Sequence, residues 1–275
     1  MRSRILLFII SFCIPASTAF ASFEHRGQDA KIEAMGGAGV ALKNSPFGIF
    51  YNPASGVTED NWSAGLSYAV PFGESSLDSF HGALQASDLP FDRNGSAGIS
   101  WQHYGASFYS ETCTYVTYAT KVAGPVRTGI SAGLLERDTD EYGSDSALGI
   151  NVGALATLSP YLSFGVAVFS VNRPRIGNSG EKIPSITFAG ASYRPGNNVL
   201  LAAAVEKQEE RNARIRSGGE VQVLSFLSLR AGFTTEPSTF SGGAGFTFRN
   251  IQGDFSFVRH PELGTGSWYT MRVSF

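Results

Sequence analysis

The sequence predicts an all-β protein: a transmembrane antiparallel β-barrel of about fourteen strands with an N-terminal plug or hatch segment. Three observations support this fold class. Apolar and polar residues alternate along most of the chain, the N-terminus has the pattern of an export signal, and the chain ends on an aromatic residue that closes an alternating stretch. The composition agrees, because only 16% of the 275 residues are charged and 32 are Gly.

The composition also excludes several classes of protein. Apolar residues make up 43% of the chain and the formal net charge is −2, so the chain is neither disordered nor a basic nucleic-acid binder. Its two cysteines exclude a disulfide-stapled miniprotein and a cysteine-rich zinc protein. The mean hydropathy of −0.02 fits a chain in which an apolar face and a polar face are averaged.

The first 21 residues are typical of a cleaved signal peptide. A short basic start is followed by an apolar stretch over residues 5–14 and then by Ala19-Phe20-Ala21, the small-residue pattern that a signal peptidase requires. A retained membrane helix is the alternative, but the apolar stretch is shorter than the ~20 residues that a span needs. We therefore expect cleavage after Ala21 and export from the cytoplasm.

Alternation with a period of two dominates the rest of the chain, as expected for strands with two different faces. In residues 62–70 every second residue is apolar or aromatic or Ala, with Ser and Gly between them, and the pattern recurs in many segments, among them Ile186/Phe188. In a transmembrane barrel the apolar face meets lipid and the small polar residues line the lumen, which explains the low charge and the high Gly content together. A soluble β-sandwich or propeller is the alternative, since these folds also alternate.

The count of fourteen strands is even, as in bacterial outer-membrane barrels, and places both barrel termini on the periplasmic side. Tight turns follow most even-numbered strands, whereas longer charged loops follow several odd-numbered ones, including residues 137–145 and 173–182. Two connections depart from this rule: the one after the second strand is long (87–94), and the one after the third is short. The predicted strands cover residues 62–71, 78–86, 95–104, 107–122, 126–138, 146–158, 161–172, 184–194, 197–207, 214–224, 226–235, 240–249, 251–259 and 267–275.

The last strand carries a further signal. Tyr269, Met271, Val273 and Phe275 alternate, and Phe275 is the final residue. A terminal aromatic on an amphipathic strand resembles the signal that the bacterial barrel-assembly machinery reads. This resemblance implies that machinery and outer-membrane lipids as partners, and the outer membrane of a Gram-negative cell as the location.

Residues 22–61 lack alternation and precede the barrel of residues 62–275. Their length suits a plug or hatch that lies in the lumen. Gly36, Gly37 and Gly39 allow close packing or positive φ, and Asn52-Pro53 is a turn signal.

Two motifs in this segment resemble the FadL-type outer-membrane superfamily. They are M-G-G-A-G-V-A (35–41) and Y-N-P-A-S-G (51–56). That superfamily has a fourteen-stranded barrel and includes channels for long-chain fatty acids and hydrocarbons, as well as the PorV/PorQ-like proteins of the type IX secretion system. In the C-terminal half, A-S-Y-R-P-G-N-N-V-L-L (191–201), V-E-K (205–207) and H-P-E-L-G (260–264) are more similar to the PorV/PorQ-like branch.

The resemblance implies two different functions. The first is a channel for hydrophobic small molecules, with a lumen blocked by the N-terminal segment and lateral exit of the ligand through the wall. The second is a secretion-associated barrel that binds exported proteins. The partners are accordingly hydrophobic small molecules or secreted proteins, and no nucleic acid.

We expect no enzyme, catalytic residue, cofactor or metal. Gly129-Ile130-Ser131-Ala132-Gly133 fits the G-x-S-x-G pattern of hydrolases, but it falls within a predicted strand, whereas that motif works at a sharp strand-to-helix turn. The four histidines lack metal-ligand spacing. Cys113, the single cysteine after signal cleavage, is expected to be a small half-buried strand residue. An outer-membrane lipid hydrolase is the third, least favoured function.

Overall fold

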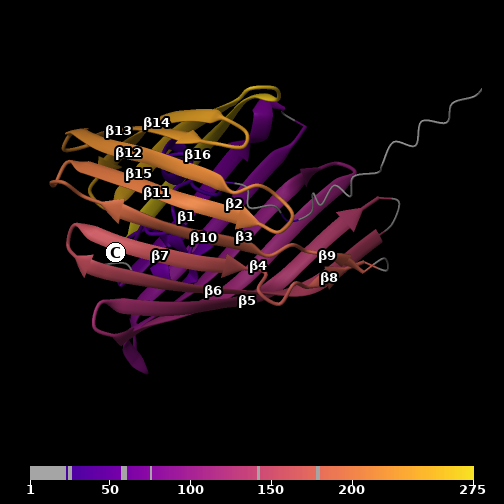
Figure 1. Cartoon of the computed structure of the whole chain (residues 1–275), viewed down its shortest axis with the longest axis horizontal. Coiled ribbons are helices and arrows are strands. Elements are labelled where there is room, and N and C mark those ends of the chain that lie inside the picture. The colour runs from indigo at the N-terminus through magenta and orange to yellow at the C-terminus, as the bar shows by residue number, and fades with distance from the viewer. Residues whose placement is uncertain (1–22, 24–26, 57–60, 75, 141–142, 178–179) are drawn as a thin grey trace, which may run out of the picture.

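The computed structural model shows one closed antiparallel barrel of fourteen strands (Figure 1). It describes residues 23, 27–56, 61–74, 76–140, 143–177 and 180–275. The predicted signal peptide lies outside these residues. The barrel strands are β1 (Trp62–Val70), β2 (Asp78–Leu89), β3 (Asp92–Ala106), β4 (Tyr109–Ala123), β5 (Val126–Thr139), β6 (Gly143–Ser159), β7 (Leu162–Phe169), β10 (Ile186–Tyr193), β11 (Val199–Gln208), β12 (Arg214–Leu224), β13 (Leu227–Thr234), β14 (Thr239–Phe248), β15 (Ile251–His260) and β16 (Gly264–Ser274).

Each of the fourteen predicted strands has a counterpart, so the predicted antiparallel barrel and its strand count are confirmed. The barrel closes where β16 pairs with β1, with Ser63 opposite Ser274. Trp62 and Phe275 also exchange two backbone hydrogen bonds, each of 2.9 Å. Closure leaves no unpaired strand edge, which is how a barrel satisfies its backbone in a membrane.

The two ends of the barrel differ in their connections. The short-turn end carries the start of β1, the end of β16 and tight turns such as residues 124–125 and 160–161. The predicted long connection over 87–94 is wrong, because β2 and β3 continue to a tight turn at residues 90–91. Local patterning missed it because Ser87 to Asn94 is polar and interrupted by Pro90.

The opposite end, which we call the long-loop end, carries the connection from β7 to β10. This connection contains a small two-stranded hairpin of β8 (Arg175–Ile176) and β9 (Glu181–Lys182), visible on the right in Figure 1. The predicted loop over 137–145 is mostly wrong, since β5 runs to Thr139 and β6 begins at Gly143. Arg137, Asp138 and Asp145 are therefore on paired strands.

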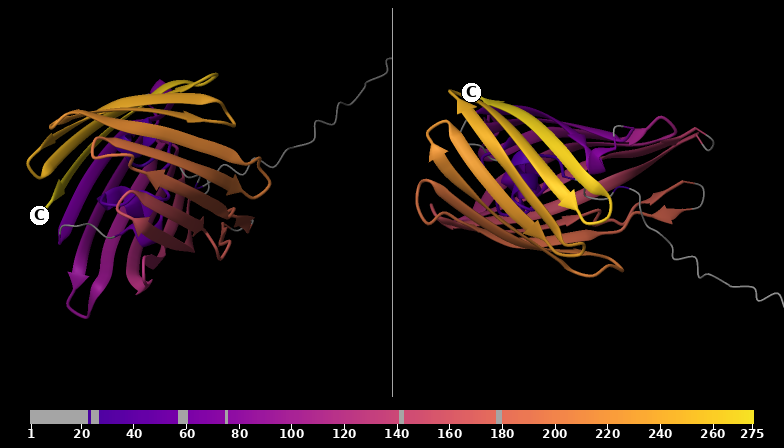
Figure 2. Two further views of the ribbon diagram at one scale, coloured as in Figure 1. Left: turned by 60° about the vertical axis from the view of Figure 1, so that its left-hand side comes forward. Right: turned by 90° about the horizontal axis from the view of Figure 1, so that it is seen from above.

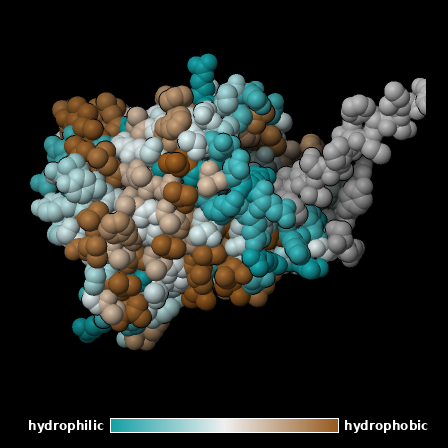
Figure 3. Space-filling view, viewed as in Figure 1, coloured by the Kyte–Doolittle hydropathy of each residue, from teal (hydrophilic) through white to brown (hydrophobic). Residues whose placement is uncertain are grey.

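The outer surface of the wall is apolar, as predicted. Leu66, Ile99 and Met271 are 68%, 51% and 60% exposed and point away from the lumen, whereas their neighbours Ser67, Ser100 and Thr270 are buried inside. Apolar residues cover much of the face in Figure 3, and polar residues gather near the long-loop end. This distribution is the reverse of a soluble β-sandwich, in which the apolar face is inside.

One predicted pair departs from this rule. Ile186 and Phe188 of β10 face inward and are 4% and 3% exposed, because they pack against Val40 of the N-terminal segment together with Ala167 and Ala204. The lumen is thus apolar at the place where the chain's own N-terminal segment contacts it.

Residues 27–56 lie inside the barrel, where Figure 2 shows them as the indigo segment enclosed by the strands. They form α1 (Ala30–Ala34), η1 (Pro46–Phe50) and η2 (Pro53–Ser55), and a fourth short helix, η3 (Pro71–Gly73), follows β1. Among the described residues, no helix is long and apolar enough to span a membrane.

Candidate functional site

The N-terminal segment is built from short, well-capped turns. Asp29 caps α1 by accepting a hydrogen bond from the backbone N–H of Lys31 at 3.0 Å. Ser45 and Asn52 cap η1 and η2 in the same way, and each is followed by Pro at the first helical position. Ser, Asp and Asn are favourable capping residues, and Pro is favourable at the first helical position. The local sequence therefore specifies these turns.

Gly36 and Gly37 lie where the segment turns after α1. Their φ angles are +68° and +74°, and a Cβ at Gly36 would lie 2.7 Å from the carbonyl oxygen of Ser217 on β12. The Gly36 carbonyl accepts from Thr234 Oγ1 at 2.9 Å, and its N–H donates to Ser241 Oγ at 3.1 Å. Gly39 has an ordinary φ, but a Cβ there would lie 2.8 Å from the ring of Tyr51.

Glycines of the wall make room for the segment. A Cβ at Gly218 would lie 2.5 Å from the Cα of Met35, closer than any ordinary contact. The same holds at several other inward glycines, each of which faces a backbone or side-chain atom of the segment. They are Gly65, Gly129, Gly153, Gly165, Gly190 and Gly232. The high Gly content therefore has a specific cause, since wall and segment backbones approach each other directly.

Asn52, in the motif of residues 51–56, bonds to the motif of residues 35–41 and to the wall. Its Nδ2 donates to the Val40 carbonyl at 2.8 Å and to the Ala154 carbonyl of β6 at 3.0 Å, while its Oδ1 accepts from the Ala54 N–H at 2.9 Å. The side chain is fully buried, and all three bonds need an amide with both donor and acceptor atoms.

A closed circuit of buried charges holds the segment on its other side. Asp29 contacts Arg272 of β16 at 3.3 Å, and Arg272 contacts Asp254 of β15 at 2.6 Å. Asp254 also contacts Arg230 of β13 at 2.7 Å. From Arg230 the circuit passes through Glu220 of β12, at 2.6 Å, and returns to the segment at Lys31, 3.1 Å from Glu220.

The two wall carboxylates of this circuit, Asp254 and Glu220, each lie between two cations. Buried charges are tolerated only when they are paired in this way, and removal of one member leaves an uncompensated charge. A separate ion pair adds to this circuit. Arg216 of β12 pairs with Glu206 at 2.6 Å, and its Nη1 lies 3.4 Å from the carbonyl oxygen of Gly36 in the segment.

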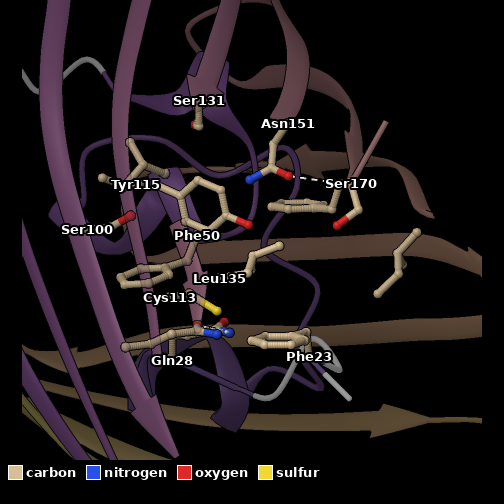
Figure 4. Close-up of a pocket in the computed structure, with 14 residues that line it drawn as sticks. Phe23, Gln28, Phe50, Ser100, Cys113, Tyr115, Ser131, Leu135, Asn151 and Ser170 are labelled. Carbon is tan, nitrogen blue, oxygen red and sulfur yellow. Dashed lines mark hydrogen bonds between the residues drawn. The ribbon is translucent and has the colours of Figure 1, made fainter. Parts of the chain in front are cut away.

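A small cavity lies between the segment and the wall of β3 to β7 and β10, toward the long-loop end (Figure 4). Its volume is about 50 Å³. Its lining is mixed, with aromatic and aliphatic side chains beside amides and hydroxyls. The lining residues are Phe23, Gln28, Ile49, Phe50, Ser100, Gln102, Cys113, Tyr115, Ser131, Leu135, Asn151, Phe169, Ser170 and Ile186.

The connection from β7 to β10 covers this cavity. Ile176 and Ile183 are almost fully buried and pack with Cys113, Leu135 and Ala147 in one apolar cluster. Arg137 of β5 fixes the hairpin at its rim, through an ion pair with Glu181 at 2.6 Å. The cavity is thus bounded by the N-terminal segment on one side and by this connection on the other.

The residues weighed for catalysis have structural partners. Ser131 lies in the middle of β5, as predicted, and its hydroxyl is 2.8 Å from that of Thr117 on β4. His81 lies in the lumen beside Ser79 at 3.1 Å, and Cys113 is buried in β4 at 2% exposure. In the described part of the chain, no three His, Cys, Asp or Glu side chains are grouped to hold a metal ion.

Sequence reasoning missed the charged circuit. Its only local signal is a set of single charges at inward strand positions, as at Asp254 and Arg272. The pairing partners are up to 243 residues apart, so alternation alone could not connect them.

Fold and site together define a fourteen-stranded barrel that encloses residues 27–56. No family model and no curated protein matches the chain. Solved structures share the fold. The toluene transporter TodX of P. putida has a TM-score of 0.69 at 11% identity, covering 92% of this chain and 99% of that one. The toluene transporter TbuX of Ralstonia pickettii has a TM-score of 0.67 at 14% identity, with 92% and 100% coverage.

A third structure, described as the CymD monoaromatic hydrocarbon channel, has a TM-score of 0.64 at 13% identity and covers 90% of this chain and 98% of that one. A Pseudomonas aeruginosa FadL homologue has a TM-score of 0.61 at 11% identity, with the same coverage. The chain is therefore similar in fold to FadL-type outer-membrane transporters over nearly its whole length.

Proposed function

We propose that the protein is an outer-membrane channel for small hydrophobic molecules and that residues 27–56 are its movable plug. The observation that carries the proposal is the attachment of the segment inside the barrel: it bonds to wall strands on opposite sides through Asn52, Gly36 and Asp29. The apolar outer surface and the signal-peptide pattern of residues 1–21 support an outer-membrane location.

The lining of the cavity supports a hydrophobic cargo. Phe23, Phe50, Leu135 and Phe169 supply aromatic and aliphatic surface, and a few hydroxyl and amide groups interrupt it. Ligand pockets for apolar molecules have this composition. The solved structures of similar fold include proteins described as toluene transporters and as a monoaromatic hydrocarbon channel, which is the same class of cargo.

The size of the cavity supports a closed state. Its volume is about 50 Å³, whereas an engineered cavity that binds benzene measures about 150 Å³. A monoaromatic molecule therefore needs roughly three times the present space. The N-terminal segment supplies Gln28, Ile49 and Phe50 to the lining, and we expect it to move before cargo can enter.

Uptake by cells tests this proposal. A deletion strain is complemented with the full-length protein or with a variant lacking residues 27–50, and entry of a radiolabelled aromatic hydrocarbon is measured. We expect the full-length protein to restore uptake and the deletion variant to admit polar solutes as well, because its lumen is open. Uptake that is the same with and without the full-length protein would refute the channel.

The same strains address the secretion-associated alternative. Its support is the resemblance of residues 191–201, 205–207 and 260–264, which lie on β10 and β11 and at the connection between β15 and β16. If the deletion strain takes up hydrocarbon normally and loses exported proteins from its surface, the partner-binding role replaces the channel.

A further inference from the structure

A second cavity lies on the other side of the N-terminal segment, at the short-turn end. Its volume is about 300 Å³, several times that of the first cavity. Lys43 comes from the loop of the segment that precedes η1, while Lys121 and Arg127 lie on either side of the turn between β4 and β5. The lining residues are Lys43, Asn44, Ala54, Ser55, Lys121, Gly124, Pro125, Arg127, Leu155 and Thr157.

Among the residues that the structure describes, three cations and no acidic residue line this cavity. Lys43, Lys121 and Arg127 come from two parts of the chain, and no described carboxylate within ion-pair distance faces any of them. Asp92, on the neighbouring strand β3, accepts hydrogen bonds from the hydroxyls of Tyr118 and Thr120 and is not among the lining residues.

Arg127 carries a second, independent observation. Its Nη1 atom is buried and has no hydrogen-bond partner among the described residues. An unpaired buried donor is costly, and it is costlier when it is charged. The other buried arginines have carboxylate partners: Arg216, Arg230 and Arg272 each contact a carboxylate oxygen at 2.6 Å, although Nη2 of Arg230 also lacks a hydrogen-bond partner.

We propose that this cavity binds an oxyanion, namely a carboxylate or phosphate group. A guanidinium group matches the two oxygens of such an anion, and two ammonium groups add charge without geometric restriction. Ala54, Pro125 and Leu155 leave apolar surface beside the cations, so the group can belong to a free anion or to the head of a small amphiphile. This site is separate from the cavity assigned to hydrophobic cargo.

Direct binding tests the proposal without any transport assay. The purified barrel in a neutral detergent and a low-salt, phosphate-free buffer is titrated by calorimetry with inorganic phosphate, with sodium hexanoate and with hexanol. Saturable binding of hexanoate with little binding of phosphate identifies an amphiphile head. Binding of both anions with similar affinity identifies a site for free anions. Hexanol has the same chain without the charge, and we expect it to show no saturable binding.

Variants assign the binding to this cavity. Arg127→Gln and Lys121→Gln should each weaken anion binding about tenfold or more, as expected for loss of one charge-assisted contact. Arg249→Gln removes an exposed cation at the same end of the barrel and should leave the affinity unchanged. Heat-modifiable migration in gels verifies that each variant is folded.

Two results would overturn the proposal. One is absence of saturable binding of both anions to the wild-type protein. The other is binding that Arg127→Gln and Lys121→Gln weaken no more than Arg249→Gln does. Neither result depends on whether the barrel transports hydrocarbons.

Discussion

The contact between Gly218 and Met35 allows a quantitative test of how the N-terminal segment is seated. A Cβ at Gly218 would lie 2.5 Å from the Met35 Cα, whereas ordinary contacts begin at 3.4 Å. Gly218→Ala therefore forces the segment away from β12 by about 3.4 − 2.5 = 0.9 Å. Overpacking of this kind typically costs about 1–3 kcal/mol, equivalent to about 5- to 150-fold in the equilibrium for local opening.

Hydrogen exchange of the segment measures this cost. The reporting amides are those of Glu33 and Gly37, which donate to the carbonyls of Asp29 and Ile32, both at 2.9 Å. In Gly218→Ala they should exchange about 5- to 150-fold faster than in the wild type, while the amides of the wall strands keep their protection.

Gly253→Ala is the matched control, because a Cβ at this strand glycine meets no atom within 4 Å. It should leave the exchange of the segment unchanged. Equal exchange rates in the two variants would show that the wall glycines do not position the segment, and the reasoning from close approach would fail.

Three further changes probe other parts of the structure. Asn52→Leu leaves the buried Val40 carbonyl without its donor, removes the side-chain bond to the Ala154 carbonyl, and should destabilise the segment by about 1–3 kcal/mol, seen as faster proteolysis within residues 27–56. Arg272→Met leaves two buried carboxylates short of a cation and should cost about 3–5 kcal/mol in urea unfolding from lipid vesicles. Ile99→Arg, on the outer face at the middle of β3, should cost about 2–4 kcal/mol, and Val223→Arg near the end of β12 about 0–1 kcal/mol.

Each of these predictions has a result that contradicts it. If Asn52→Leu resists protease as well as the wild type does, the Asn52 amide does not hold the segment. If Arg272→Met leaves the urea midpoint unchanged, the charged circuit adds no stability. Equal costs for the two outer-face arginines would argue against a bilayer around the middle of the wall.

Much of the wall could be predicted because its pattern is local. Alternating residues such as those over 62–70 report which side of a strand faces lipid, and all fourteen strands follow from that periodicity. Strand ends were harder to place, since the polar stretch from Ser87 to Asn94 has the composition of a loop and yet continues the pairing of β2 with β3.

The interior could be predicted only in part. Glycines and a turn signal indicated a compact N-terminal segment, but its contacts join residues that are far apart in the chain, as Asp29 and Arg272 are. Ile186 and Phe188 show the same limit: their alternation resembles that of lipid-facing pairs, and only the position of Val40 inside the barrel explains why they face inward.

The central claim is that cargo passes only when the N-terminal segment moves, and thiol labelling during transport tests it most directly. Val40→Cys in a Cys113→Ser background places a thiol at a position that is 2% exposed. Ala119→Cys in the wall, at 0% exposure, and the exposed Ser76→Cys serve as protected and reactive controls. We predict that an aromatic hydrocarbon accelerates labelling at position 40 and leaves position 119 protected. Hydrocarbon flux at the wild-type rate with no labelling at position 40 would contradict the claim.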